Sequence, residues 1–97
     1  MNELELLIHQ PSRLRIMAAL VALPGGENID FVSLKGLSKL TDGNLSSHLS
    51  TLEKAGYVSL DRTFEEKKTK TRIWVNSKGR KAFSQYVKEL EQLLNGI

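Results

Sequence analysis

Apolar residues recur at spacings of three and four in several stretches of the chain, a pattern that predicts helices. A short N-terminal helix is expected to place Leu4, Leu7 and Ile8 on one face. It must end before Pro11, which suits the first turn of a second helix instead. The expected apolar face of that second helix consists of Leu14, Met17, Ala18, Leu20 and Val21. The sequence PGG at residues 24–26 ends it.

The middle of the chain predicts two helices that follow each other closely. The segment ENIDF is read as a brief strand that leads to Asp30, the N-cap of a helix over residues 31–40. Thr41 then caps a helix over residues 42–55. Because the connection is minimal, the two helices must cross at a steep angle. The apolar side of the first of the two is expected to hold Phe31, Leu34, Leu37 and Leu40.

After Gly56, a predicted helix terminator, the apolar period changes from about 3.6 to 2, which predicts a β-hairpin. Val58, Leu60 and Phe64 are expected on the half-buried face of its first strand, and KTRIWV forms its second. The charged segment EEKKT is the loop between them. A last helix, capped by Asn76 or Ser77, follows. These elements predict one α+β domain, mostly helical, over residues 1–97.

The predicted helix over residues 42–55 has an unusual exposed side. Leu45, Leu49, Leu52 and Ala55 fall on the core side. The opposite side carries small polar residues and one lysine: Gly43, Asn44, Ser46, Ser47, Ser50 and Lys54. Small polar residues weaken helix interiors by up to about 1 kcal/mol each relative to Ala, so this face needs a reason. It permits close approach, either of a DNA major groove or of a partner helix, and the helix alone does not choose between them.

The charge distribution favours nucleic acid. The chain carries +3 in total, but residues 62–81 hold eight basic and two acidic side chains, a net +6, and the remainder carries −3. A localised basic stretch attracts phosphates regardless of the net charge. The expected phosphate contacts on the hairpin are Lys67, Lys68, Lys70 and, in the strand, Arg72.

Three segments resemble winged helix-turn-helix transcription regulators similar to the MarR and ArsR families. PSRLRIMAAL is similar to the opening helix of ArsR-type proteins, and IWVNSKGRKAF is similar to the segment that closes the wing and opens the last helix. LTDGNLSSHLSTLEKAGYV resembles the recognition-helix segment. The positions that match it are Ser46, His48, Leu49, Leu52, Ala55, Gly56 and Val58.

This resemblance implies that residues 42–55 enter the major groove and that the hairpin, residues 62–72, is a wing on the adjacent backbone or minor groove. His48 matches a position that buttresses the recognition helix. Many relatives have a long basic residue where this chain has Ser47, which implies weaker base readout or more reliance on DNA shape. The cysteine, or His and Asp, ligands of metal-sensing members are absent.

The terminal segments carry more apolar surface than one small domain easily covers, which predicts a homodimer. The expected interface combines the N-terminal segment with the last helix: Leu4, Leu7, Ile8, Tyr86, Val87, Leu90, Leu93 and Leu94. A two-fold dimer would set two recognition helices about 34 Å apart, one DNA turn.

The sequence therefore predicts a sequence-specific regulator of double-stranded DNA, in its simplest form a homodimeric repressor. We expect no enzyme activity, metal or cofactor, because the chain has no cysteine and its two histidines lie apart from any triad or metal-ligand spacing. The absence of a basic leader or a long apolar run predicts a cytoplasmic chain without a membrane partner. A winged helix that binds a protein partner is the alternative, and whether a small effector binds is left open.

Overall fold

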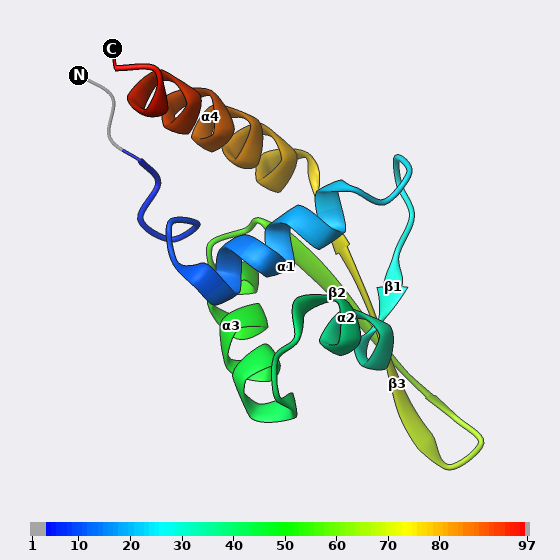
Figure 1. Ribbon diagram of the computed structural model, residues 1–97. Coiled ribbons are helices and arrows are strands. Elements are labelled where there is room, and N and C mark those ends of the chain that lie inside the picture. Colours follow the sequence, from blue (N-terminus) through cyan, green and yellow to red (C-terminus); the bar gives the residue numbers. More distant parts are fainter. Residues whose placement is uncertain (1–3, 97) are drawn as a thin grey trace.

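The computed structural model describes residues 4–96, which form helices packed on one side of a small sheet (Figure 1). The elements, in chain order, are α1 (Pro11–Val21), β1 (Ile29–Asp30), α2 (Phe31–Ser38), α3 (Asp42–Lys54), β2 (Val58–Glu65), β3 (Lys68–Val75) and α4 (Ser77–Leu94). The sheet is antiparallel in the order β1-β3-β2, because Ile29 and Asp30 pair with Ile73 and Arg72. The predicted brief strand is thus confirmed, and it extends the two-stranded wing at its base.

One hydrophobic cluster joins all of these elements. Its fully buried members include Ile16, Met17 and Leu20 of α1, together with Leu34, Leu45, Leu49, Leu52 and Ile73 from the other elements. The prediction for α1 was wrong at two positions, because Ala18 is exposed and Ile16 is buried. Ile16 lies four residues before Leu20, so the buried stripe is rotated slightly from the expected one.

The predicted N-terminal helix is not formed over the described residues. Residues 6–8 make a turn in which the amides of Ile8 and His9 both donate to the Glu5 carbonyl. The side chain of Gln10 accepts a hydrogen bond from the Arg13 amide and caps α1 at once. Between Leu4 and this cap only one turn forms, and a single turn is not stable as a helix.

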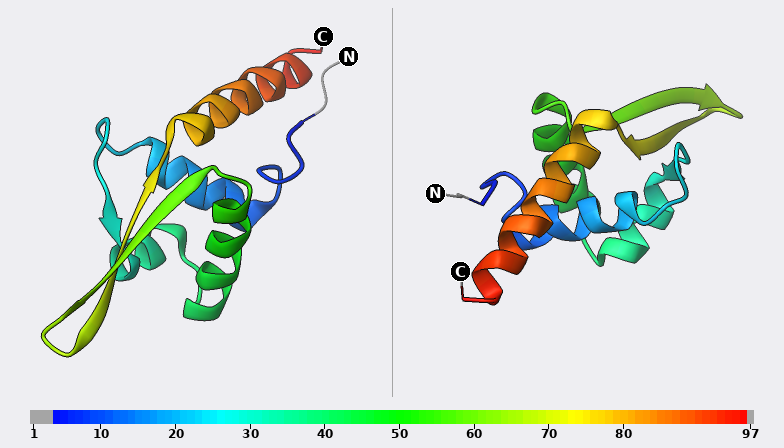
Figure 2. Two further views of the ribbon diagram at one scale, coloured as in Figure 1. Left: turned by 180° about the vertical axis from the view of Figure 1, so that it is seen from behind. Right: turned by 90° about the horizontal axis from the view of Figure 1, so that it is seen from above.

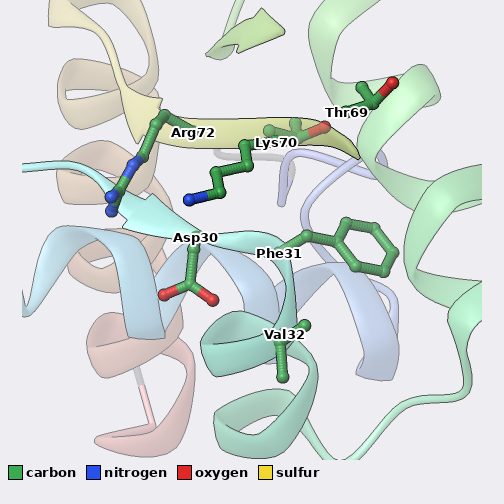
Figure 3. Close-up of a pocket in the computed structure, with 7 residues that line it drawn as sticks. Asp30, Phe31, Val32, Thr69, Lys70 and Arg72 are labelled. Carbon is green, nitrogen blue, oxygen red and sulfur yellow. The ribbon is translucent and has the colours of Figure 1, made fainter. Parts of the chain in front are cut away.

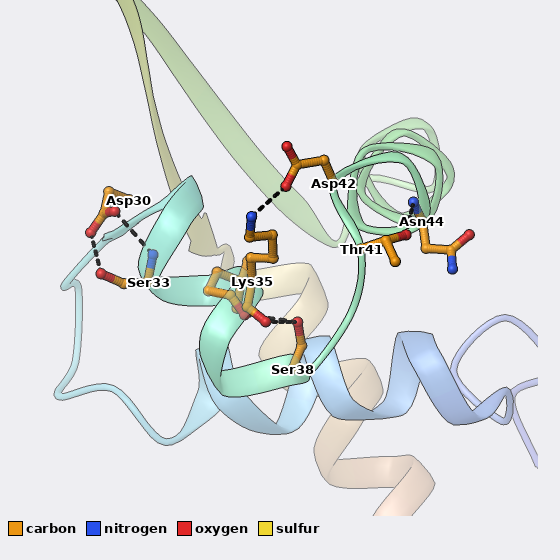
Figure 4. Close-up of polar contacts among 8 residues, drawn as sticks. Asp30, Ser33, Lys35, Ser38, Thr41, Asp42 and Asn44 are labelled. Atoms are coloured by element: carbon orange, nitrogen blue, oxygen red, sulfur yellow. Dashed lines mark hydrogen bonds and ion pairs between the residues drawn. The ribbon is translucent and has the colours of Figure 1, made fainter.

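The connection between α2 and α3 is short and capped at both ends (Figure 4). Lys39, with φ of 58°, ends α2 two residues before the predicted end. Thr41 caps α3 by accepting from the Asn44 amide, and the Lys35 ammonium lies 2.7 Å from the Asp42 carboxylate. Leu37 is 61% exposed, contrary to prediction, because a spacing of three drifts away from a helical face of period 3.6.

The wing is a regular hairpin that projects beyond the helices (Figure 1). Its register is uninterrupted from the Val58–Val75 pair to the Glu65–Lys68 pair. The predicted five-residue loop is only a two-residue turn, in which Glu66 and Lys67 have φ of 49° and 63°, as a tight turn matching the strand twist requires. Phe64 is 73% exposed rather than half-buried, because it lies in the part of the wing that projects beyond the helices.

The last helix, α4, leaves the body in the direction opposite to the wing, and the molecule measures 53 × 25 × 22 Å (Figure 2). Asn76 caps α4 by accepting from the Gly79 amide. A Cβ on Gly79 would stand 2.0 Å from the Tyr57 carbonyl oxygen, so the start of α4 needs glycine there. The segment 4–10 and the C-terminal half of α4 lie near the same end of the molecule (Figure 2).

Candidate nucleic-acid interface

The small polar face expected on α3 is present and open to solvent. The leucines on the opposite side of α3 point into the core: Leu45, Leu49 and Leu52. The six predicted contact residues of this helix are all exposed: Gly43, Asn44, Ser46, Ser47, Ser50 and Lys54. Within residues 4–96, no helix packs on this face, and a Cβ built on Gly43 would meet nothing within 4 Å. The partner helix that the sequence left open is therefore not supplied by residues 4–96.

The orientation of α3 is fixed from behind by Arg13 of α1. The Arg13 guanidinium donates to His48 Nδ1 at 3.2 Å, and its Nε donates to the Leu7 carbonyl at 2.5 Å. An arginine only donates, so His48 accepts through Nδ1 and is neutral in this contact. Burial, and then the positive charge of Arg13, lowers the pKa of His48. The predicted buttressing position of His48 is thus linked to both α1 and the N-terminal segment.

A small cavity of about 100 Å³ joins α3 to the wing. Ser46 and Ser50 line it from the helix, and Leu60, Arg62 and Thr71 line it from the sheet. Arg62 therefore points to the same side as the serine face of α3. Arg62 is absent from the predicted contact residues, although the alternation of β2 places it on the face of Leu60.

The predicted wing cations are exposed but lie mostly on the other face of the hairpin. Lys68, Lys70 and Arg72 alternate with the core residue Ile73 along β3, so all three share the face away from it. Lys67 occupies the turn. The Lys70 ammonium is 3.4 Å from a Glu65 carboxylate oxygen. This ion pair offsets part of the positive charge that Lys70 would offer to a phosphate.

Lys70 and Arg72 border a second cavity, of about 310 Å³, beside the start of α2 (Figure 3). Asp30 lies across from the two cations, and the Phe31 ring points away from Asp30 (Figure 3). Hydrogen bonds from the hydroxyl and the amide of Ser33, with a smaller effect of Arg72, lower the pKa of Asp30. The carboxylate therefore serves α2 as its N-cap rather than pairing with the wing.

The predicted dimer residues divide into two groups. Ile8 and Tyr86 are 0% and 2% exposed and belong to the core of this chain, where the Tyr86 hydroxyl lies 2.8 Å from His9 Nδ1. Leu4, Leu7, Val87 and Leu90 are partly buried against that core. Leu93 and Leu94 are 60% and 75% exposed at the end of α4. The apolar surface that is left for a dimer contact is thus smaller than predicted, because the turn at residues 6–8 folds Ile8 into the core.

Within residues 4–96, no three His, Asp or Glu side chains gather in a way that could hold a metal ion. No helix in the same range combines the length and the apolar character that crossing a membrane requires.

Comparisons with known proteins agree with this architecture. A family model described as a winged helix DNA-binding domain matches residues 12–94. An uncharacterized protein of Methanocaldococcus jannaschii is 40% identical over 85 residues, which span 88% of this chain and 89% of that protein.

Two solved structures share the fold. One is a transcriptional regulator homologue from Pyrococcus horikoshii, with a TM-score of 0.83, 24% identity, and coverage of 95% of this chain and 88% of that one. The other is NadR in complex with 4-hydroxyphenylacetate, with a TM-score of 0.68, 19% identity, and coverage of 92% of this chain and 63% of NadR.

The exposed helix face, the projecting hairpin and the match over residues 12–94 lead to one conclusion. The chain belongs to the winged helix DNA-binding domain family.

Proposed function

We propose that this protein is a transcriptional regulator that binds a specific sequence of double-stranded DNA as a homodimer and represses by occupying a promoter. The observation that carries the proposal is the exposed small polar face of α3 with Arg62 and the wing beside it. In this proposal α3 enters the major groove, where serine and asparagine side chains reach phosphates and base edges. Lys54, Lys67 and Lys68 neutralise the phosphates on either side.

The second copy is proposed to pack along the exposed end of α4, where Leu93 and Leu94 are 60% and 75% exposed. This end also brings in Leu6, which is 78% exposed. It lies away from the wing, so a two-fold contact there leaves both α3 faces free for DNA (Figure 1).

The direct experiment is to select bound duplexes from a fragmented genomic library at low and moderate salt and to sequence them. We expect an inverted repeat with half-sites about one helical turn apart, since a two-fold dimer presents two copies of α3. Binding without any enriched sequence would contradict sequence-specific regulation. No binding to duplex at either salt would favour a protein partner on the α3 face. Binding to such a partner would depend little on salt.

The wing is tested by replacing both Lys67 and Lys68 with Ala. We expect weaker binding to all duplexes alike and a salt slope smaller by about 2, because each lost phosphate contact removes close to one released counterion. Lys81→Ala with Lys88→Ala is the matched control, since it removes the same charge from exposed positions on α4. Equal slopes for the two double variants would remove the wing tip from the interface.

A further inference from the structure

Phe64 is a large aromatic side chain that the fold leaves in solvent. It is 73% exposed and lies two residues before the turn at Glu66 and Lys67. Single exposed apolar residues are common on protein surfaces, so exposure alone assigns no role. The position of Phe64 on the wing and the charges around it are what distinguish it.

The face on which Phe64 stands follows from the register. The pairing of β2 with β3 has no bulge from Val58 to Glu65, so alternate residues keep to one side throughout. Leu60 on this side packs on the core, and Arg62 lines the cavity shared with Ser46 and Ser50 of α3. Phe64 continues the same row. Its ring therefore stands on the side of the wing that faces the proposed DNA surface.

The backbone that carries the ring is paired on both sides, and the ring itself is not covered. Its cross-strand neighbour is Thr69, which is small and itself exposed. The backbone on both sides of Phe64 is paired up to the Glu65–Lys68 rung, and a two-residue turn closes the hairpin. A regularly paired hairpin thus presents an aromatic side chain without burying it.

The length of the wing carries Phe64 toward a groove beside the one that α3 would occupy. Phe64 is four residues beyond Leu60, about 13 Å along an extended strand. The minor groove flanking a bound major groove is half a helical turn away, about 17 Å. Lys67 lies in the turn just beyond Phe64, where it can neutralise a backbone that borders a minor groove, and Lys68 follows it on the opposite face of the hairpin.

We propose that Phe64 is a wedge: its ring enters the minor groove beside the α3 site, partly unstacks one base step and bends the DNA. This inference rests on the proposed function. Apolar side chains inserted from the minor groove kink duplexes by about 20–90°. Pyrimidine–purine steps unstack most easily, so the bound sites carry TA or CA/TG at the wedge position, where no side chain reads a base edge.

The test uses the full chain and one duplex recovered by the selection described above. Dyes at the two ends of the duplex report bending by energy transfer, and 2-aminopurine at the flanking step reports unstacking. We expect the native protein to shorten the end-to-end distance and to brighten the 2-aminopurine. Phe64→Ala should lose both signals and roughly tenfold or more in affinity. It removes no charge, so its salt slope should match that of the native protein.

Two variants separate the wedge from a mere change in the hairpin. Phe64→Leu keeps an apolar wedge and should retain most of the bend. Thr63→Ala, on the opposite face of the same strand, should bend DNA as the native protein does. Fluorescence of the single tryptophan, Trp74 in β3, checks that the sheet is intact in each variant.

Each outcome decides the matter. Loss of the bend in Phe64→Ala, with salt-dependent binding retained, supports the wedge. Equal bending by Phe64→Ala and the native protein, or a straight duplex with the native protein, overturns the wedge and leaves the proposed function intact. Failure of the native protein to bind duplex even at low salt overturns both.

Discussion

At the scale of single residues, Arg13 has the widest influence on the candidate interface. Its side chain is partly exposed, yet it connects Leu7 of the N-terminal segment to His48 of α3 through hydrogen bonds. Its partner is a histidine, whose charge changes near neutral pH. The contact requires a neutral imidazole, because a protonated ring has no acceptor and would face the Arg13 charge.

This contact makes the stability of the fold depend on pH. The pKa of His48 lies below its ordinary value of 6.5 in the folded chain, chiefly through burial. The unfolded chain therefore binds more protons between the two values, and stability falls as the pH drops below about 6.5 toward the folded pKa. We expect His48→Gln to show a shallower loss of the free energy of unfolding over this window.

The titration of the His48 ring, followed by NMR, measures the shift directly. Arg13→Gln keeps a donor but removes the charge, so we expect it to raise the pKa of His48 partway toward 6.5. A His48 pKa at or above 6.5 in the native protein would contradict this account.

At the scale of elements, short-range signals set where the helices start. Asp30, Thr41 and Asn76 each accept from a backbone amide three residues later, as the sequence indicated. How each helix is placed depends on contacts that no local signal announces. The start of α4 lies so close to the chain after α3 that Gly79 is buried against the Tyr57 carbonyl.

A matched pair of glycine substitutions tests this packing. Gly79→Ala should lower the free energy of unfolding by about 2 kcal/mol or more, because its Cβ collides with backbone that cannot turn aside. Gly36→Ala, in α2 with nothing within 4 Å, should instead raise it by about 0.5–1 kcal/mol. Urea unfolding followed by circular dichroism measures both. An unchanged free energy of unfolding in Gly79→Ala would mean that α4 can shift away from Tyr57 at little cost.

At the scale of the whole molecule, the two ends of the long axis have different surfaces. The wing end carries cations and Phe64, and the opposite end carries the exposed leucines of α4 (Figure 2). This separation allows one end to bind DNA while the other binds a second copy. It also allows the two activities to be removed independently.

Replacing Leu93 and Leu94 by Glu tests the proposed dimer. We expect the dissociation constant of self-association to rise by at least about 100-fold, because two apolar side chains per chain lose their burial. Sedimentation equilibrium measures this change. Leu37→Glu is the control, since Leu37 is an equally exposed leucine on α2, at 61%. Unchanged self-association in the α4 variant would place the dimer contact elsewhere.

Much of the fold was predictable from the sequence because its signals are local. The period of apolar residues, the caps and the turn glycine act within a few residues of each other, and they located α1 to α4 and the wing. The serine-rich face of α3 was predictable for the same reason, since helical geometry alone places Ser47 and Ser50 opposite Leu45 and Leu49.

The local pattern of the sequence therefore predicts α1 to α4, the wing, the bare face of α3 and the family resemblance, but not the turn that replaces the expected N-terminal helix. The tertiary structure alone decided which apolar residues the chain uses for its own core: Ile8 is buried, whereas Leu37 and Phe64 are exposed. It also decided that α3 lies beside the face of the wing that carries Arg62, and not beside the face that carries Lys68 and Lys70. Burial and the packing of α3 beside the wing depend on contacts between distant segments, and these contacts leave no periodic trace in a single sequence.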